Sequence, residues 1–581
     1  MNSISDFALI WSFVGKRWKH IVIGALFVII TNVLHAIIPS IIGRAVDLMH
    51  DDFAMRSLLQ IVGLILVLEF IKGVSRFLMR YIIIRESWKI ENDIRLRIFN
   101  HLLKLPLTFY NKSRTGDIIA RITNDLTAVR FMIGPAVMYT MNAVILLPTA
   151  LVFMFVKDFE LALYGIVPFP VIALVIFLAG KRIHRYFKKV QESYSDISAH
   201  VQENLNGIRV VKSYVREHFE LDMLRTLSLK YVDNNRRIIQ LQSFYQPFLD
   251  VLASTGVLIV LWMGAKKVAA GETTLGTIVA LIMYIGLLVW PSIALGWVIA
   301  IFQRGMASTR RLSELLNEAP ERQDDSSDES ILKGSISVRN LSFSYSDNSK
   351  VLKDISFDVR PGETIAILGR TASGKSTLLD VLSGAYDVPR GMIWYDGIDI
   401  NDLPLTKLRS SIALVPQETF LFSVTVGENI AFGKEGAENE SIRKAAVLAA
   451  IDEEIDSYPD GYETLLGERG ITLSGGQRQR IAIARALINH APILFFDDCL
   501  SNVDTSTEMK ILKNIKNIIK NKTALIVTQR VGAIKDADEI LYMKSGEVIE
   551  RGTHKELMEL NGEYAALYNE QESLEGLEET A

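Results

Sequence analysis

Long apolar runs fill the first half of the chain, whereas the second half contains only short ones. Six segments before about residue 305 reach the length of about 20 apolar residues that a helix needs to cross a bilayer. These segments are residues 21–43, 58–84, 133–156, 161–180, 248–268 and 275–302. The pattern predicts an all-α domain of six transmembrane helices over residues 1–305.

Basic residues are concentrated before the first of these segments and in the long connections after the second and the fourth. Because Lys and Arg remain on the cytoplasmic side of a membrane, we expect these connections and both termini in the cytoplasm. Both connections keep a helical spacing of apolar residues, which indicates long intracellular helical loops. The chain is therefore predicted to be a multi-pass protein of the plasma membrane, in contact with the lipid bilayer.

The pattern changes after the sixth segment. Residues 306–334 include the polar, acidic stretch NEAPERQDDSSDES, and we expect them to form a linker. From residue 335 to 581, short strand-like runs such as ISVRNLSFSY and ETIAILG alternate with helical patterns. This alternation predicts a cytoplasmic α/β domain with a largely parallel sheet.

Charge and cysteine content narrow the class of protein. The 581 residues carry a formal net charge of -3, which argues against nucleic acid as a partner. The single cysteine, Cys499, excludes an internal disulfide. We interpret it as a small buried residue rather than as a redox centre.

A glycine-rich stretch, GRTASGKST, follows the apolar strand at residues 364–368 and precedes the helical pattern LLDVLSG. This is the context of a phosphate-binding P-loop, in which backbone N–H groups surround the phosphates. Lys375 would neutralise the terminal phosphates, and the Ser376 hydroxyl would bind Mg²⁺. The candidate nucleotide-binding residues here are Gly369, Arg370, Thr371, Ala372, Ser373, Gly374, Lys375, Ser376 and Thr377.

Two further motifs lie downstream. The apolar strand ILFFDD ends in Asp497, which is expected to hold the Mg²⁺. The stretch LSGGQRQR opens the helical run IAIARAL, and a Ser-Gly-Gly turn at a helix N-terminus is a second site for anions. One chain therefore carries two half-sites for phosphate.

These two motifs, with six predicted spans in front, resemble those of a half-transporter of the ATP-binding cassette (ABC) superfamily, in its exporter branch. The resemblance covers nearly the whole chain and implies ATP and Mg²⁺ as ligands. It also implies a head-to-tail dimer of cassettes, in which the LSGGQ signature of one chain closes the nucleotide site of the other. The signature residues are Ser474, Gly475, Gly476 and Gln477.

The resemblance assigns further roles. It implies that Tyr345 stacks on adenine, that Gln417 senses the γ-phosphate and Mg²⁺, and that Asp504 lies in an interface loop between the nucleotide sites. The stretches RTGDIIARITNDLTAVR and QENLNGIRVVKSYVRE are similar to the two intracellular loops of the family. Each such loop is expected to end in a short helix that docks on a cassette.

Two positions depart from the pattern of a hydrolysing cassette. Asp498 stands where the family has Glu, and Gln529 stands where it has His. The shorter acid moves its carboxylate by about 1 Å, which can lower a rate ~100-fold. Glutamine forms hydrogen bonds but cannot carry charge. Together the changes resemble the degenerate site of a heterodimeric exporter, which holds ATP while its signature completes the site of a partner half-transporter with Glu and His.

Candidate substrate contacts lie in the apolar segments. Glu69 and Lys72 share a helix face, so they form either a structural pair or a substrate contact. Trp290 and Trp297 either line a cavity for flat amphipathic compounds or anchor the helix at the membrane interface. No motif identifies the cargo, but the resemblance favours small amphipathic compounds, as in multidrug exporters, or lipids.

Two other functions compatible with these residues stay open. A homodimer of this chain could hydrolyse ATP slowly with Asp498. A regulatory membrane protein could bind ATP without pumping anything.

Overall fold

The computed structural model consists of two compact units, each of which is described by itself. The helical unit comprises Met1–Leu103 and Ser113–Ala319, and the sheet unit comprises Lys104–Lys112 and Pro320–Ala581. The residues whose structure is described are 6–51, 55–322, 331–345, 349–467, 470, 473–499, 507, 510–511, 513–514 and 522–578.

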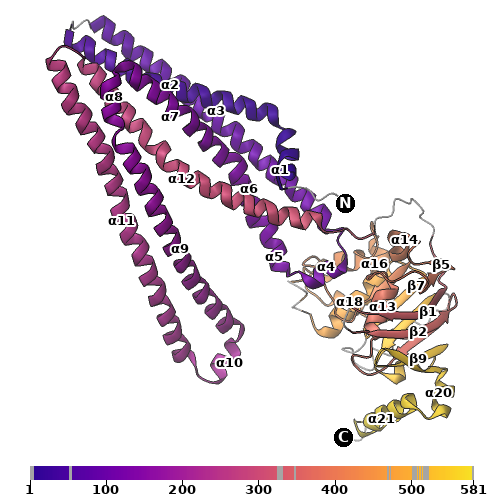
Figure 1. Cartoon of the computed structure of the whole chain (residues 1–581). Coiled ribbons are helices and arrows are strands. Elements are labelled where there is room, and N and C mark those ends of the chain that lie inside the picture. Colours follow the sequence, from indigo (N-terminus) through magenta and orange to yellow (C-terminus); the bar gives the residue numbers. More distant parts are fainter. Residues whose placement is uncertain are drawn as a thin grey trace. The chain divides into compact units, whose positions relative to one another are not determined.

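The helical unit is built only of helices over its described residues (Figure 1). They are α1 (Asp6–Gly15), α2 (Trp18–Asp51), α3 (Met55–Leu102), α5 (Thr115–Ala120), η1 (Arg121–Asp125), α6 (Leu126–Phe131), η2 (Met132–Ala136), α7 (Val137–Lys157), α8 (Phe159–Ile166), α9 (Pro168–Asn206), α10 (Ile208–Ser213), α11 (Glu217–Ala269) and α12 (Leu275–Asn317). Six helical segments are long and apolar enough to cross a membrane, and each contains one predicted span. The prediction of six transmembrane helices is confirmed.

These helices extend far beyond the apolar segments. Helix α3 has 48 residues, so it is about 70 Å long, whereas the hydrocarbon core of a bilayer is about 30 Å thick. Helices α9 and α11 have 39 and 53 residues, lie side by side and are joined at one end by the short helix α10 (Figure 1). The expected long helical loops are therefore continuations of the membrane helices.

Helices α2 and α12 pack in close contact. A Cβ added at Gly276 would meet the carbonyl oxygen of Gly43 at 1.9 Å, so only glycine permits this approach. The Asp47 carboxylate accepts a hydrogen bond from the Gly276 backbone N–H at 2.7 Å, and Tyr284 Oη donates to the Ala36 carbonyl at 2.7 Å. Buried polar groups are thus paired along the contact, as a membrane interior requires.

Two boundaries differ from the sequence prediction. Helix α12 continues to Asn317, although the linker was expected to begin at residue 306. The helix persists because Leu312, Leu315 and Leu316 recur at helical spacing and are buried. The second difference is that Lys104–Lys112, expected in the membrane domain, belongs to the sheet unit and contains the short helix α4 (Leu107–Lys112).

The sheet unit contains two sheets. The order of the four-stranded sheet is β2-β1-β4-β5, and that of the six-stranded sheet is β10-β9-β3-β8-β7-β6. In the second sheet all neighbours pair in parallel except β10 and β9, which confirms the predicted α/β domain. The strands are β1 (Ile336–Phe343), β2 (Leu352–Val359), β3 (Thr364–Leu368), β4 (Ile393–Tyr395), β5 (Ile398–Asp399), β6 (Ile412–Val415), β7 (Ile493–Asp497), β8 (Thr523–Thr528), β9 (Glu539–Lys544) and β10 (Glu547–Gly552).

Helices surround these sheets. They are α13 (Lys375–Leu382), α14 (Leu405–Ser410), α15 (Val426–Ala431), α16 (Asn439–Leu448), α17 (Asp452–Asp456), α18 (Gly475–Leu487), α20 (His554–Leu560) and α21 (Glu563–Glu578), with short 3₁₀ turns η3 (Gly461–Glu463) and η5 (Val531–Ile534).

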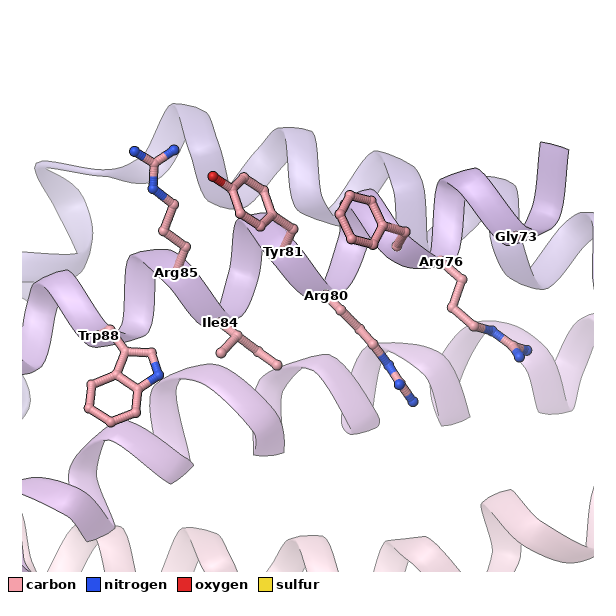
Figure 2. A pocket seen from close by; sticks show the side chains of 8 residues that line it. Gly73, Arg76, Arg80, Tyr81, Ile84, Arg85 and Trp88 are labelled. Carbon is pink, nitrogen blue, oxygen red and sulfur yellow. The ribbon is translucent and has the colours of Figure 1, made fainter. Parts of the chain in front are cut away.

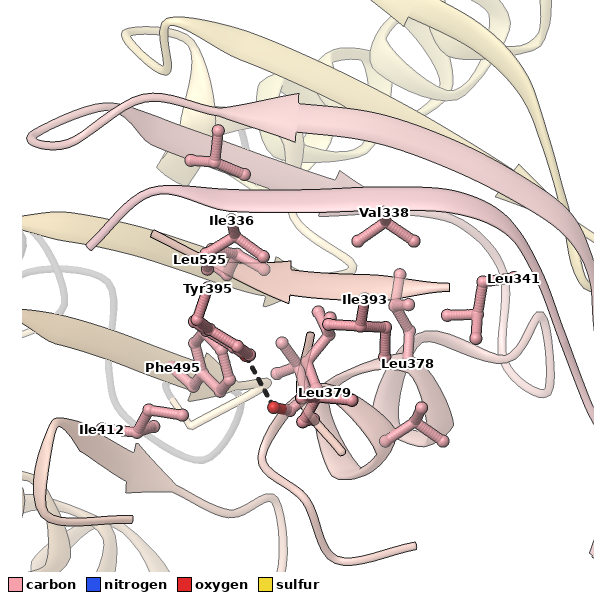
Figure 3. Packing of buried hydrophobic residues seen from close by; sticks show 14 of the residues in the cluster. Ile336, Val338, Leu341, Leu378, Leu379, Ile393, Tyr395, Ile412, Phe495 and Leu525 are labelled. Carbon is pink, nitrogen blue, oxygen red and sulfur yellow. Dashed lines mark hydrogen bonds between the residues drawn. The ribbon is translucent and has the colours of Figure 1, made fainter. Parts of the chain in front are cut away.

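One hydrophobic cluster fixes α13, the helix that follows the glycine-rich stretch (Figure 3). Leu378 and Leu379 of this helix are buried with Ile336 of β1 and Phe495 of β7. Each such side chain contributes about 1.5–3 kcal/mol when it is buried. Tyr395 Oη also donates to the Leu382 carbonyl at 2.6 Å, at the last residue of the helix. The N-terminus of α13 therefore has a fixed position relative to the sheet.

Candidate functional site

Four parallel strands bring the predicted nucleotide residues to one edge of the six-stranded sheet. Strands β6, β7, β8 and β3 are consecutive neighbours, so their carboxyl ends lie at the same edge. Gln417 follows β6, Asp497 ends β7, Gln529 follows β8 directly, and residues 369–377 follow β3. Ligands of open α/β sheets bind at this edge.

The glycine-rich loop has a backbone that demands glycine. Gly369 has φ 154°, and a Cβ there would meet the Met543 carbonyl oxygen at 2.3 Å. Gly374 is the left-handed N-cap of α13, with φ 100°. The loop thus leads into a helix whose first backbone N–H groups are free to bind an anion.

Lys375 lies folded over this loop. Its Nζ donates to the carbonyl oxygens of Gly369 at 2.7 Å and Arg370 at 2.9 Å. Burial lowers the pKa of this ammonium group, and the nearby Asp498 and Asp497 partly oppose that effect. A phosphate group in the loop would stabilise the buried charge, so the loop fits the nucleotide phosphates predicted from the sequence.

The donor set for Mg²⁺ lies beside the loop. Ser376 Oγ donates to Asp497 Oδ1 at 3.0 Å. Burial raises the pKa of Asp497, the charge of Asp498 adds to the rise, and the Ser376 hydrogen bond opposes it. A cation would stabilise this buried carboxylate, and hydroxyl, carboxylate and the amide oxygen of the exposed Gln417 are ligands that suit Mg²⁺.

The described residues contain no cluster of three or more His, Cys, Asp or Glu side chains that could hold a metal by themselves. Mg²⁺ commonly binds through one or two protein groups together with substrate phosphates, so this finding agrees with the donor set above.

The two unusual residues bind each other. Gln529 Nε2 donates to Asp498 Oδ2 at 3.2 Å, and Thr371 Oγ1 donates to Gln529 Oε1 at 3.5 Å. Asp498 is buried and has φ 43°, and its backbone N–H donates to the Val527 carbonyl at 2.9 Å. The Asp498 carboxylate is therefore held toward Gln529 at the end of β7.

Tyr345 is half exposed, as a base-stacking residue must be. Its Oη donates to Thr377 Oγ1 at 3.0 Å, and its ring packs edge-on against Tyr386 with 5.2 Å between centroids. Tyr386 Oη in turn accepts a hydrogen bond from Asn111 Nδ2 of α4 at 2.8 Å. Sequence reasoning missed Asn111 and Tyr386, because no motif marks either residue.

The signature forms the N-terminus of α18. Ser474 is the N-cap: its Oγ accepts from the Gln477 backbone N–H at 3.2 Å, and Gln477 Oε1 accepts from the Ser474 N–H at 2.9 Å. The Gln477 side chain also donates to Glu454 Oε2 at 3.1 Å. Gly475 and Gly476 occupy the first turn of the helix. A serine-capped helix N-terminus with two glycines can approach an anion closely.

The remaining predicted residues are placed as follows. Asp504 lies outside the described residues. Cys499 is buried, as expected. Lys72 Nζ and Glu69 Oε1 form an ion pair at 2.5 Å, and the rings of Trp290 and Trp297 lie 5.7 Å and 5.3 Å from the ring of Tyr139 on α7.

The predicted intracellular loops end in short helices, with one change of position. The first short helix is α4, which precedes the quoted stretch RTGDIIARITNDLTAVR; that stretch itself forms α5, η1 and α6. The second is α10, which follows Gly207, the C-cap of α9. The short helix α4 begins after Pro106 and so lies before the first quoted stretch.

Comparisons with known families match both units. The family described as ABC transporter transmembrane region matches residues 21–292, and the family described as ABC transporter matches residues 352–501.

Relatives match over nearly the whole chain. The probable multidrug resistance ABC transporter ATP-binding/permease protein YheI of Bacillus subtilis is 36% identical over 96% of this chain and 96% of its own length. The ATP-dependent lipid A-core flippase of Vibrio vulnificus is 32% identical over 97% of each chain. A solved bacterial Atm1-family ABC exporter with ATP bound superimposes with a TM-score of 0.78 and 26% identity, covering 95% of this chain and 98% of that one.

Proposed function

The chain belongs to the ABC transporters, and from this premise we propose that it is one subunit of a heterodimeric exporter whose own ATP site is degenerate. It is an ATP-driven ABC exporter of the multidrug and lipid-flippase type, with multiple helices in the plasma membrane. In this proposal the two nucleotide sites of the dimer differ: one retains ATP and the other hydrolyses it.

The pairing of Asp498 with Gln529 carries the proposal. A residue that polarises the attacking water must reach it, but the Asp498 carboxylate is one methylene short and accepts a hydrogen bond from Gln529. The Gln529 amide cannot carry the positive charge that a histidine could add near the transferred phosphate. Both changes weaken hydrolysis while leaving the groups that bind the nucleotide intact.

The residues of this site other than Asp498 and Gln529 bind ATP. The N–H groups of the loop and Lys375 bind the phosphates, and the half-exposed ring of Tyr345 supports the adenine ring. Ser376, Asp497 and Gln417 would hold Mg²⁺, which would supply positive charge beside the phosphates. This chain's own site therefore retains ATP and turns it over slowly.

The signature serves the nucleotide of the partner chain. Ser474 is exposed at the N-terminus of α18, so its hydroxyl and the helix dipole are available to a phosphate that a second chain presents. The partner is a second half-transporter with Glu and His at the two altered positions. Hydrolysis then takes place on the partner's P-loop, under the signature of this chain.

Exposed apolar residues at the tip formed by α10 favour contact of this tip with a second chain. Val210, Tyr214 and Val215 are 60%, 75% and 79% exposed. Surfaces of this kind are common at protein–protein contacts. We infer that this tip docks on the cassette of the partner.

Orientation and cargo follow from the basic loops and the relatives. Both termini and the nucleotide-binding domain lie in the cytoplasm, because Lys and Arg are concentrated in the connections on that side. The cargo is a small amphipathic compound, of the drug or lipid-like type that the names of the relatives indicate.

Dye uptake into inside-out membrane vesicles tests the proposal. The chain is expressed alone and together with a half-transporter that has Glu and His at the two positions. We expect ATP-dependent accumulation of an amphipathic dye only with the pair. Equal uptake by the chain alone would indicate a homodimeric pump, and no uptake by the assembled pair would indicate a protein that binds ATP without pumping.

A further inference from the structure

A cavity of about 320 Å³ lies among α2, α3, α7 and α12. A groove of larger volume, about 570 Å³, is lined by residues of α3 (Figure 2). Arg76 and Arg80 line both, so the two spaces adjoin at these side chains. The chemistry of this cavity indicates which cargo it accepts.

Two guanidinium groups give the cavity its charge. Arg76 and Arg80 are four residues apart, and Figure 2 shows both side chains extending to the same side of α3. Over the described part of the chain neither guanidinium has an acidic partner, and the nearby Glu69 carboxylate is already paired with Lys72. Unpaired charges within a transmembrane helix are costly and typically face a pathway for polar substrates.

A second helix that lines the cavity, α2, offers a buried hydroxyl. Thr31 on α2 is only 2% exposed and lines the cavity, yet its Oγ1 has no hydrogen-bond partner among the residues that the structure describes. The neighbouring Asn32 is fixed, because its Nδ2 donates to Asn142 Oδ1 at 2.8 Å and to the Val28 carbonyl at 2.8 Å. A buried hydroxyl without a partner is unfavourable, and a polar group of a ligand would supply the missing hydrogen bond.

Aromatic rings form the third part of the cavity. Trp290 of α12 and Tyr139 of α7 both line it, with 5.7 Å between their ring centroids. Trp290 is 57% exposed and thus presents an open, flat apolar face. Such faces bind the apolar body of a ligand.

We propose that this cavity binds an anionic amphiphile, with a phosphate or carboxylate head between Arg76 and Arg80 and an apolar body against Tyr139 and Trp290. Guanidinium groups bind such heads in bidentate fashion, and Thr31 of α2 adds a donor in the same cavity. The inference rests on the proposed export function and names its class of cargo. Of the candidate substrate residues, it retains Trp290 and assigns Glu69 and Lys72 to a structural pair.

A matched pair of dyes tests this proposal in inside-out vesicles that contain the assembled transporter. Pyrenebutyrate and pyrenebutyl-trimethylammonium share one aromatic body and differ in the sign of the head. We expect ATP-dependent uptake of the anion, and a loss of about tenfold or more in R76Q/R80Q, because two charge-assisted hydrogen bonds are removed. Uptake of the cation should not fall in this variant, and a melting temperature close to that of the wild type would show that it folds.

Two further variants test whether uptake of the anion needs positive charge at the cavity or positive charge anywhere on α3. R76K/R80K keeps both positive charges and should retain most of the anion uptake. R85Q removes a charge from the same helix; the Arg85 side chain lines the groove but not the cavity, and its guanidinium lies 5.6 Å from the Tyr81 ring. This variant should stay within twofold of the wild type.

A second probe shows whether the anion that the cavity binds is a membrane lipid or a soluble compound. Translocation of an acyl-labelled phosphatidylglycerol would assign the cavity to anionic lipids, and uptake of pyrenebutyrate alone to soluble organic anions; either supports the proposal. Anion uptake unaffected by R76Q/R80Q, an equal loss in R85Q, or transport of the cation alone would overturn it while leaving the export function in place. Uptake of no probe would contradict the export function itself.

Discussion

Asp498 and Gln529 are the two residues that differ from the pattern of a hydrolysing cassette, and a hydrogen bond joins their side chains. The sequence identified each residue, but not that the two side chains contact each other, since 31 residues separate them. Their contact depends on the parallel pairing of β7 with β8, which brings the ends of the two strands together. Sequence motifs also singled out residues 369–377 and 474–477 as candidate phosphate-binding stretches, whereas Asn111 and Tyr386 carry no local signal.

The first prediction tests whether the proposed degenerate site can be repaired. Asp498→Glu alone should leave ATP turnover by the purified chain within about threefold of the wild type, because Gln529 still lies beside the carboxylate and adds no charge. The double variant D498E/Q529H should raise turnover about 30-fold or more, since both position and charge are restored.

The control for this comparison is Lys375→Ala in the double variant, which should abolish the gain. Turnover restored fully by D498E alone would show that Gln529 has no part in the impairment.

A second prediction follows from Asp380 on α13. Burial raises the pKa of this carboxyl from 3.8 to about 6, with a contribution from the charge of Asp497. The folded state therefore binds the proton more tightly than the unfolded state, so stability falls by up to about 3 kcal/mol as the pH rises from 4 through 6. Asp380→Asn should raise the melting temperature at pH 7 and make little difference at pH 4.5.

Thermal unfolding of the purified full chain at both pH values measures this difference, because effects of other titrating groups cancel between variant and wild type. An Asn variant with the same stabilisation, or none, at both pH values would contradict the assignment.

At the scale of the elements, reciprocal caps begin three helices in the described part of the sheet unit. Thr425 with Glu428, Ser474 with Gln477, and Thr553 with Glu556 each form a capping box. Only the cap of α18 belongs to the signature. Comparing two of these caps can therefore separate a role in catalysis from a role in helix stability.

The third prediction uses this comparison in the assembled pair. Ser474→Ala and Thr553→Ala should each cost about 1 kcal/mol of stability through the lost cap. Only Ser474→Ala should lower ATP turnover, by about 10- to 100-fold, because it alone removes a hydrogen bond to the partner's nucleotide. Normal turnover of the Ser474 variant would refute the claim that this signature completes the active site.

The fourth prediction concerns the contact of α2 with α12. Gly276→Ala places a methyl group against the Gly43 carbonyl and should lower the melting temperature of the full chain by about 5 °C or more. Gly63→Ala is the matched control, because a Cβ at that position on α3 meets nothing within 4 Å. If both variants melt alike, the close approach of the two helices does not hold.

At the scale of the whole molecule, the apolar runs were sufficient to predict six membrane helices and one α/β domain. They did not predict where the helical unit ends and the sheet unit begins. Composition placed the linker at residue 306, but Leu312 and Leu315 are buried and extend α12. Composition also could not show that α4 packs with the sheet unit, because that depends on a tertiary contact, the hydrogen bond from Asn111 to Tyr386.

The central claim is that this chain retains ATP while its partner hydrolyses it. ATP turnover by the purified chain alone tests this claim most directly. The chain is reconstituted in lipid with Mg²⁺ and radiolabelled ATP, and vanadate-sensitive phosphate release is measured together with the nucleotide that stays bound. We predict tightly retained, unhydrolysed ATP with release near background. Steady vanadate-sensitive turnover on the order of 1–10 s⁻¹, as in an ordinary enzyme, would contradict the account.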